Sequence, residues 1–289
     1  MSMPIDYAQA ERVFNISFSK LDRPAARVDF PRMGALSEQM TNLLTAPDPA
    51  AATFPHQHLS MLATASIEMW HRAIHSFIWS VALTEDSPLW SSVSGYYASH
   101  YVMRAFAHSM GIYKSFIQKS ALQIVPQGTQ FVGTRLSERG GEHAFYWRAV
   151  KGHPRYRADP LFHENQERDV NKRVDESDVL HRNFANYADH LDSFTAAKFS
   201  STGKVAERVQ KISRIRRHSV TASAPQRDSF PDIGNVQILA FQRIVAFNDF
   251  LEEKVPNNRF WRTHRRPSWC RDVMLFQLEE QGPEQPLSA

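Results

Sequence analysis

Aromatic, cationic and imidazole side chains share one face of a helix that we predict over residues 88–110. A helix turns by about 100° per residue, which brings five of these side chains into one stripe: Tyr97, His100, Tyr101, Arg104 and His108. We call this stripe the tyrosine–histidine face. Imidazole transfers protons near neutral pH, and guanidinium binds anions as a rigid fork. A solvated helix face is the alternative, but these rings and cations better suit a cleft or a second subunit.

A second group of cations lies at the end of a helix predicted over residues 205–217, and comprises Arg214, Arg216, Arg217 and His218. Arg214 and His218 are four positions apart, so a continuing helix would place them on one face. An arginine and a histidine placed in this way could bind a phosphate and move a proton. The alternative is that these positive side chains only stabilise the C-terminal end of the helix dipole.

Two pairs with the pattern acid-x-x-His, Glu68–His71 and Asp178–His181, have the spacing that helical bundles use to hold two metal ions. Ligands of that kind must point into the bundle core. On the first long helix Trp70 marks the buried side, whereas Glu68 and His71 fall on the polar flank. We therefore expect no metal ion and no other cofactor.

Helical periodicity dominates the chain. Apolar residues recur at three- and four-residue spacing in several segments, namely residues 7–14, 36–44, 58–83, 88–110, 177–196, 205–217 and 236–255. Short β-type runs separate the second and third long helices, at residues 123–125, 129–136 and 143–150. The Gly140-Gly141 pair predicts a hairpin turn between the last two runs, and residues 154–173 are expected to form a loop. The predicted fold class is mainly α, a four- or five-helix bundle with a small β-hairpin insertion and an N-terminal helical arm.

Proline-rich and basic segments suggest the limits of the bundle. Residues 1–57 form the arm and its linker, which contains Pro47, Pro49 and Pro55. The bundle itself covers residues 58–255, with the insertion at residues 121–173. Residues 256–289 form a basic-aromatic tail. We expect the aromatic residues of this tail to pack against the end of the bundle rather than to bind nucleic acid.

The composition of the 289-residue chain, 42% hydrophobic and 22% charged, is that of a globular protein with a buried core. A single cysteine, Cys270, excludes an internal disulfide framework and a paired-cysteine zinc module, which indicates a reducing, cytoplasmic location. Apolar runs are too short to span a membrane, and the start of the chain lacks the pattern of a signal peptide. The formal charge of +4 permits an anionic partner.

The helix with the tyrosine–histidine face also resembles a known family. Its residues Ser94-Gly95-Tyr96-Tyr97-Ala98-Ser99-His100-Tyr101-Val102-Met103-Arg104-Ala105, followed by Gly111, are similar to the second helix of HEPN domains. The order of later features is similar too, with His181 at the head of the third helix, then the cations of residues 214–218, then a final apolar helix. The resemblance covers about residues 58–253 and implies a HEPN-like helical bundle.

Active HEPN domains are metal-independent ribonucleases that work as dimers, so the resemblance implies a homodimer that cleaves RNA through the RNA 2′-hydroxyl. The family pattern is an arginine, four to six residues, then a histidine, and the matching place here is Arg214–His218, with three residues between them. By this resemblance His218 is the acid/base, and Arg214, Arg216 or Arg217 holds the phosphate. The tyrosine–histidine face, together with Arg216, is then the surface that contacts RNA or the second subunit. Such proteins serve in toxin–antitoxin and antiviral systems.

The rival interpretation is a catalytically inactive HEPN-like binding module. It would use the tyrosine–histidine face to associate with a partner protein, such as a nucleotidyltransferase or an antitoxin, or to hold a nucleotide. The short spacing between Arg214 and His218 favours this rival.

Overall fold

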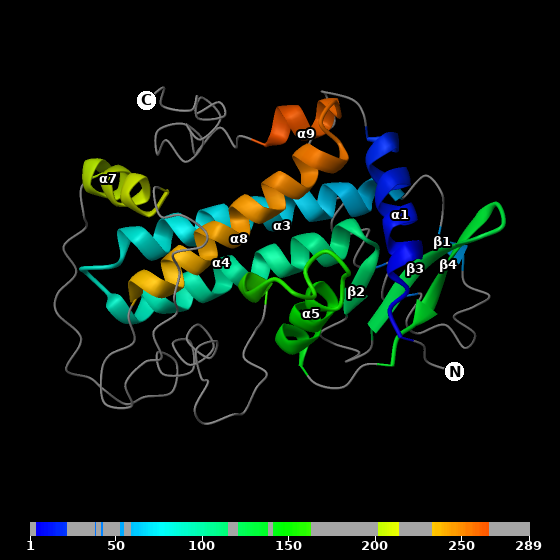
Figure 1. Ribbon diagram of the computed structural model, residues 1–289, viewed down its shortest axis with the longest axis horizontal. Helices are drawn as coiled ribbons and strands as arrows, with labels where there is room; N and C mark the ends of the chain where they lie inside the picture. Colours follow the sequence, from blue (N-terminus) through cyan, green and yellow to red (C-terminus); the bar gives the residue numbers. More distant parts are fainter. Residues whose placement is uncertain are drawn as a thin grey trace, which may run out of the picture.

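The computed structural model shows a mainly helical protein with a small antiparallel sheet at one end (Figure 1). It describes Glu38, Asn42 and residues 4–21, 53–54, 59–114, 121–137, 141–162, 202–213 and 233–265. Most of the predicted helix at residues 36–44, the whole predicted helix at 177–196 and the tail from residue 266 lie outside the described residues. The predicted mainly α class is confirmed, and so is the presence of a small β element.

Three long helices run side by side and form the centre of the molecule (Figure 1). They are α3 (Leu59–Ala82), α4 (Pro88–Ser109) and α8 (Ile233–Lys254), and each coincides closely with a predicted helix. Pro88 stands in the first turn of α4, where its missing N–H leaves no bond unmade, and Gly111 follows the helix with a φ of 70°. The Trp70 indole donates to the carbonyl of Ile244 at 3.3 Å, which fixes α3 to α8 inside the apolar core.

α4 and α8 approach each other closely at Gly95. A Cβ atom added at Gly95 would lie 2.7 Å from Cγ1 of Val236 and 3.0 Å from Oγ of Ser80. Beside this contact, the Gln237 amide donates to the Ser80 carbonyl at 3.0 Å and to the Ser91 hydroxyl at 3.1 Å. Small and polar side chains therefore set the spacing of all three helices at this end of the bundle.

A buried arginine joins α8 to its neighbours. Arg243 donates to the carbonyl of Leu161 in η2 (Pro160–Phe162) at 2.8 Å and to the Ser99 hydroxyl on α4 at 2.9 Å. Its guanidinium lies over the Trp147 ring at 4.4 Å. The charge is thus buried among hydrogen-bond acceptors and an aromatic face, which lowers the cost of removing it from water.

α1 (Tyr7–Lys20) begins at Asp6, whose side chain accepts from the Gln9 N–H, and is longer than the helix predicted over residues 7–14. Its buried face joins the main core, where the Phe14 and Phe250 rings lie 5.1 Å apart. The predicted arm therefore packs on the body of the molecule.

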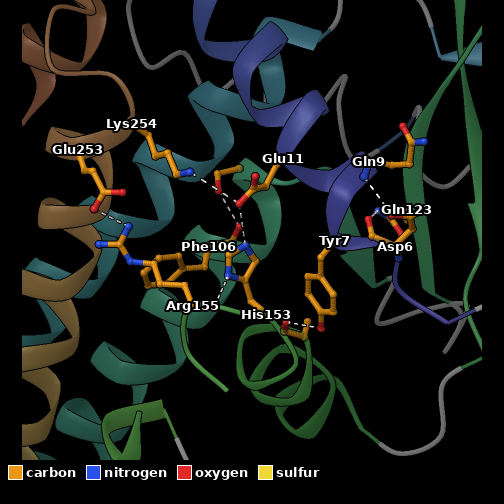
Figure 2. A network of polar contacts seen from close by, with 12 residues as sticks. Asp6, Tyr7, Gln9, Glu11, Phe106, Gln123, His153, Arg155, Glu253 and Lys254 are labelled. Atoms are coloured by element: carbon orange, nitrogen blue, oxygen red, sulfur yellow. Dashed lines mark hydrogen bonds and ion pairs between the residues drawn. The ribbon is translucent and has the colours of Figure 1, made fainter. Parts of the chain in front are cut away.

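Polar contacts hold the other side of α1 (Figure 2). The Tyr7 hydroxyl donates to the carbonyl of Ala149 at 2.8 Å. The Glu11 carboxylate lies 3.5 Å from Nε2 of buried His153 and 3.7 Å from Nζ of Lys254. Removal of water around His153 lowers the pKa of its imidazole, while Glu11 acts in the opposite direction.

The sheet consists of β1 (Thr53–Phe54), β2 (Ile112–Lys114), β3 (Ala121–Gln127) and β4 (Gln130–Arg135) in the order β1-β4-β3-β2, with every pair antiparallel. β3 and β4 match two of the predicted runs, whereas β1 and β2 were not predicted. The inner residues of the sheet form a second apolar cluster with α1 and the start of α3, and this cluster contains Val13, Leu62 and Ile124.

The predicted strand at residues 143–150 is wrong, because these residues lie in α5 (Glu142–Lys151). The predicted hairpin turn at Gly140-Gly141 is wrong for the same reason, since Gly141 is the N-cap of that helix. The actual hairpin turn joins β3 to β4 at Gly128, which has a φ of 60°. Five of the six residues 145–150 are buried, so this short helix contains an apolar run like that of a buried strand.

Two short helices complete the described structure. α7 (Thr202–Ser213) packs on α3. α9 (Arg259–His264) begins at Asn258, whose side chain accepts from the Trp261 N–H at 2.9 Å and donates to the Phe18 carbonyl at 2.8 Å. Phe260 and Trp261 are buried, whereas Arg259 and Arg262 are exposed, so the expected packing of the tail is confirmed in its described part.

The close approach at Gly95 can be tested by Gly95→Ala. Overpacking costs about 1–3 kcal/mol, and alanine regains about 1 kcal/mol of helix propensity over glycine, so we expect a net loss of up to about 2 kcal/mol in the free energy of unfolding. Urea denaturation measures this change. Val236→Ala removes the clashing methyl group, so the double variant should be more stable than the sum of the two single effects. Strict additivity would show that the contact does not limit the helix spacing.

Candidate functional site

The tyrosine–histidine face of α4 packs against α5. His100 and His108 are buried, with 2% and 4% of their surface exposed, whereas Tyr97, Tyr101 and Arg104 are half-buried. The face therefore meets another part of the same chain and stays partly open at its edge.

Two imidazoles stack at the centre of this contact. The rings of His100 on α4 and His143 on α5 lie 4.0 Å apart and 25° from parallel. The Tyr96 hydroxyl lies 2.8 Å from Nδ1 of His143, and the Tyr96 ring also stacks on that imidazole at 5.5 Å. When the hydroxyl donates to Nδ1, the proton of the neutral imidazole resides on Nε2. The Tyr96 hydroxyl and ring thus fix the orientation of the His143 imidazole.

One turn further along α4, a guanidinium faces the start of α5. Nη1 of Arg104 lies 3.3 Å from Oε1 of Glu142, and the guanidinium carbon lies 5.5 Å from the centre of the Tyr146 ring. In the part of the chain that the structure describes, the buried Nε of Arg104 has no hydrogen-bond partner. About a quarter of the Arg104 side-chain surface, 24%, remains exposed beside this ion pair.

The inner end of the contact is a buried hydrogen-bonded group. The Tyr146 hydroxyl accepts from the Lys114 N–H at 3.1 Å and lies 3.3 Å from Nε2 of His108. Burial lowers the pKa of His108 well below its usual value, and the charge of Arg104 lowers it further. Burial also raises the pKa of the Tyr146 hydroxyl above its usual value. Both groups are neutral at physiological pH, so this end of the contact is structural. We call the whole set the α4–α5 cluster: Tyr96, Tyr97, His100, Tyr101, Arg104, His108, Lys114, Glu142, His143 and Tyr146.

The structure brings together only part of the predicted site. All five residues of the tyrosine–histidine face lie in the α4–α5 cluster. The predicted catalytic residues Arg214, Arg217 and His218, together with Arg216, lie outside the described residues.

Sequence reasoning missed Glu142, His143 and Tyr146, because residues 143–150 were predicted to form a strand. One signal was present. Glu142 directly follows two glycines, and an acidic residue in the first turn is favourable beside the positive end of a helix dipole. A helix beginning at Glu142 places Tyr146 on the same face one turn later.

Only one of the two acid-x-x-His pairs, Glu68–His71, lies in the described structure. Glu68 is buried, contrary to the polar flank assigned to it, and Oε1 of its carboxylate accepts from the Arg72 guanidinium. Nε2 of His71 lies 2.6 Å from the His264 carbonyl, and burial lowers the pKa of this imidazole to about 4. Asp178 and His181 lie outside the described residues. Among the residues that the structure does describe, no three His, Cys, Asp or Glu side chains are grouped so as to hold a metal ion.

The chain matches no protein-family model, no curated protein and no solved structure. None of the helices in the described ranges is long and apolar enough to cross a lipid bilayer.

The lowered pKa values of His71, His108 and His153 predict loss of stability in acid. The unfolded chain, with histidine pKa values near 6.5, binds protons more readily than the folded protein. The free energy of unfolding should therefore be greatest above that pH and fall as the pH drops toward about 4. Each unit of pKa difference contributes about 1.4 kcal/mol.

Urea denaturation across this pH range measures the effect. The variant His71→Gln, which keeps a hydrogen-bond donor but does not titrate, should show a shallower decline. His75→Gln is the control, since His75 is exposed on the same helix. An unchanged pH dependence in His71→Gln would contradict the assignment.

Proposed function

We propose that the protein is a HEPN-like, metal-independent endoribonuclease, a cytoplasmic homodimer that cleaves RNA through the 2′-hydroxyl of the RNA. The observation that carries this proposal is the half-buried imidazole of His143, which is oriented by Tyr96 and stacked on His100, while Arg104 pairs with the preceding residue, Glu142. The mainly helical fold, in which three long helices form the centre, supports the HEPN-like assignment.

The reaction needs one group to accept a proton and another to supply one. The 2′-oxygen bonds to phosphorus while a base removes its proton, and the bond from phosphorus to the 5′-oxygen breaks as an acid protonates that oxygen. The products are a 2′,3′-cyclic phosphate and a 5′-hydroxyl. Histidine suits both proton transfers, and arginine stabilises the negative charge that develops on the phosphate oxygens.

Within the α4–α5 cluster, His143 is the imidazole placed to move a proton, because His100 and His108 are buried. Arg104 is the cation placed to bind the phosphate. The resemblance also assigns His218 as acid/base, with Arg214, Arg216 or Arg217 on the phosphate.

A binding module without activity is the second candidate, and one observation favours it. The Arg104 guanidinium already pairs with Glu142, and His108 is locked against Tyr146 inside the protein. A site closed in this way would serve association with a partner protein, such as an antitoxin or a nucleotidyltransferase, rather than catalysis.

Incubation of the purified protein with total RNA in EDTA separates the two candidates. We expect chelator-resistant cleavage that leaves cyclic phosphate ends. His143→Gln should slow cleavage by about 100-fold or more, which is the usual contribution of a general acid or base. His218→Ala should abolish it if the resemblance assigns the second proton carrier correctly.

His75→Gln is the matched control, because it removes an exposed histidine far along the sequence from the α4–α5 cluster. Intact RNA with the native protein would contradict the nuclease and favour the binding module. Cleavage that stops in EDTA would contradict metal independence, and full activity of His143→Gln would remove His143 from the mechanism.

A further inference from the structure

Two tyrosine rings lie at the open edge of the α4–α5 cluster. Tyr97 and Tyr101 are one helical turn apart, with ring centres separated by 6.1 Å and planes inclined by 35°. Both side chains are half-buried, whereas Tyr96 and His100 behind them are buried. No residue in the described ranges hydrogen-bonds the hydroxyl of Tyr97 or Tyr101. Both the rings and the hydroxyls of these half-buried side chains can therefore contact a ligand.

Neighbouring rings hold the two tyrosines in place. Tyr97 makes edge contacts with His143 at 5.8 Å and with Tyr96 at 5.6 Å, and Tyr101 packs on His100 at 6.1 Å. Rings fixed in this way lose little conformational freedom when a flat ligand stacks on them, so binding costs less entropy. The arrangement is a preformed stacking surface.

We propose that Tyr97 and Tyr101 stack the bases of single-stranded RNA, with a neighbouring phosphate bound by Arg104. This inference rests on the proposed function for the choice of RNA. Arg104 is three residues beyond Tyr101 on the same face, so aromatic rings and a cation follow each other along α4, as in surfaces that bind single strands.

The ring spacing favours a single strand over a duplex. Neighbouring nucleotides of one strand of a double helix are about 3.4 Å apart along the axis, whereas the two tyrosine rings are 6.1 Å apart. The rings thus match bases that have been separated from each other. Bases inside a duplex are already stacked on both faces and offer no surface to the tyrosines.

Fluorescence anisotropy with a labelled oligodeoxynucleotide tests binding apart from cleavage, since a strand without 2′-hydroxyl groups cannot be cleaved by the proposed reaction. At fixed salt, we expect the single strand to bind more tightly than the same sequence in a duplex. Tyr97→Ala and Tyr101→Ala should each weaken single-strand binding by about 5- to 150-fold. Tyr97→Phe and Tyr101→Phe should bind like the native protein, because they keep the ring.

Trp90→Ala is the matched control, since Trp90 is an exposed aromatic residue on the same helix outside the cluster. Equal affinity for single strand and duplex, no detectable binding of either, or native affinity in both alanine variants would overturn the stacking surface. Circular dichroism of each variant confirms that it is folded. If binding follows the prediction but RNA stays intact in EDTA, the stacking surface holds and the nuclease fails. If RNA is cleaved but the alanine variants bind like the native protein, the nuclease holds and the stacking surface fails.

Discussion

The hydroxyl of Tyr146 is the group on which the α4–α5 contact depends. It accepts from the Lys114 N–H in β2 and lies within hydrogen-bond distance of His108 on α4, so three elements meet at one oxygen. A buried polar group without a partner costs about 1–3 kcal/mol, and the backbone of β2 and the imidazole of His108 both need this oxygen. Because Tyr146 is fixed in this way, α5 can place His143 against His100 and Glu142 against Arg104.

The sequence was sufficient to predict the long helices, because their apolar spacing repeats over 22 to 24 residues. α3, α4 and α8 were found in this way, and the proline and glycine at the two ends of α4 were interpreted correctly. The prediction missed α5 for a physical reason. Phe145, Tyr146, Trp147, Ala149 and Val150 are all buried, and a short helix buried on most sides has the same apolar run as a buried strand. β1 and β2 have two and three residues, too few for any alternation to show.

The candidate site was also predicted only in part. A helical wheel was enough to place Tyr97, Tyr101, Arg104 and His108 on one side of α4 and to indicate that this side does not simply face water. The wheel could not show which segment covers that side of α4. The covering residues lie in α5, about forty positions later in the chain, and a wheel describes one helix alone. His143 became part of the site only when the tertiary structure brought its imidazole over His100.

The hydrogen bond from Asn258 to the Phe18 carbonyl joins residues 240 positions apart, and Phe14 packs on Phe250 in the same region. During synthesis on the ribosome, α1 can pack on α3 and β3 once residue 127 has been made. The part of its apolar face around Phe14 must wait for α8, which is made about a hundred residues later. Nascent chains that stop before α8 would therefore keep that end of α1 uncovered.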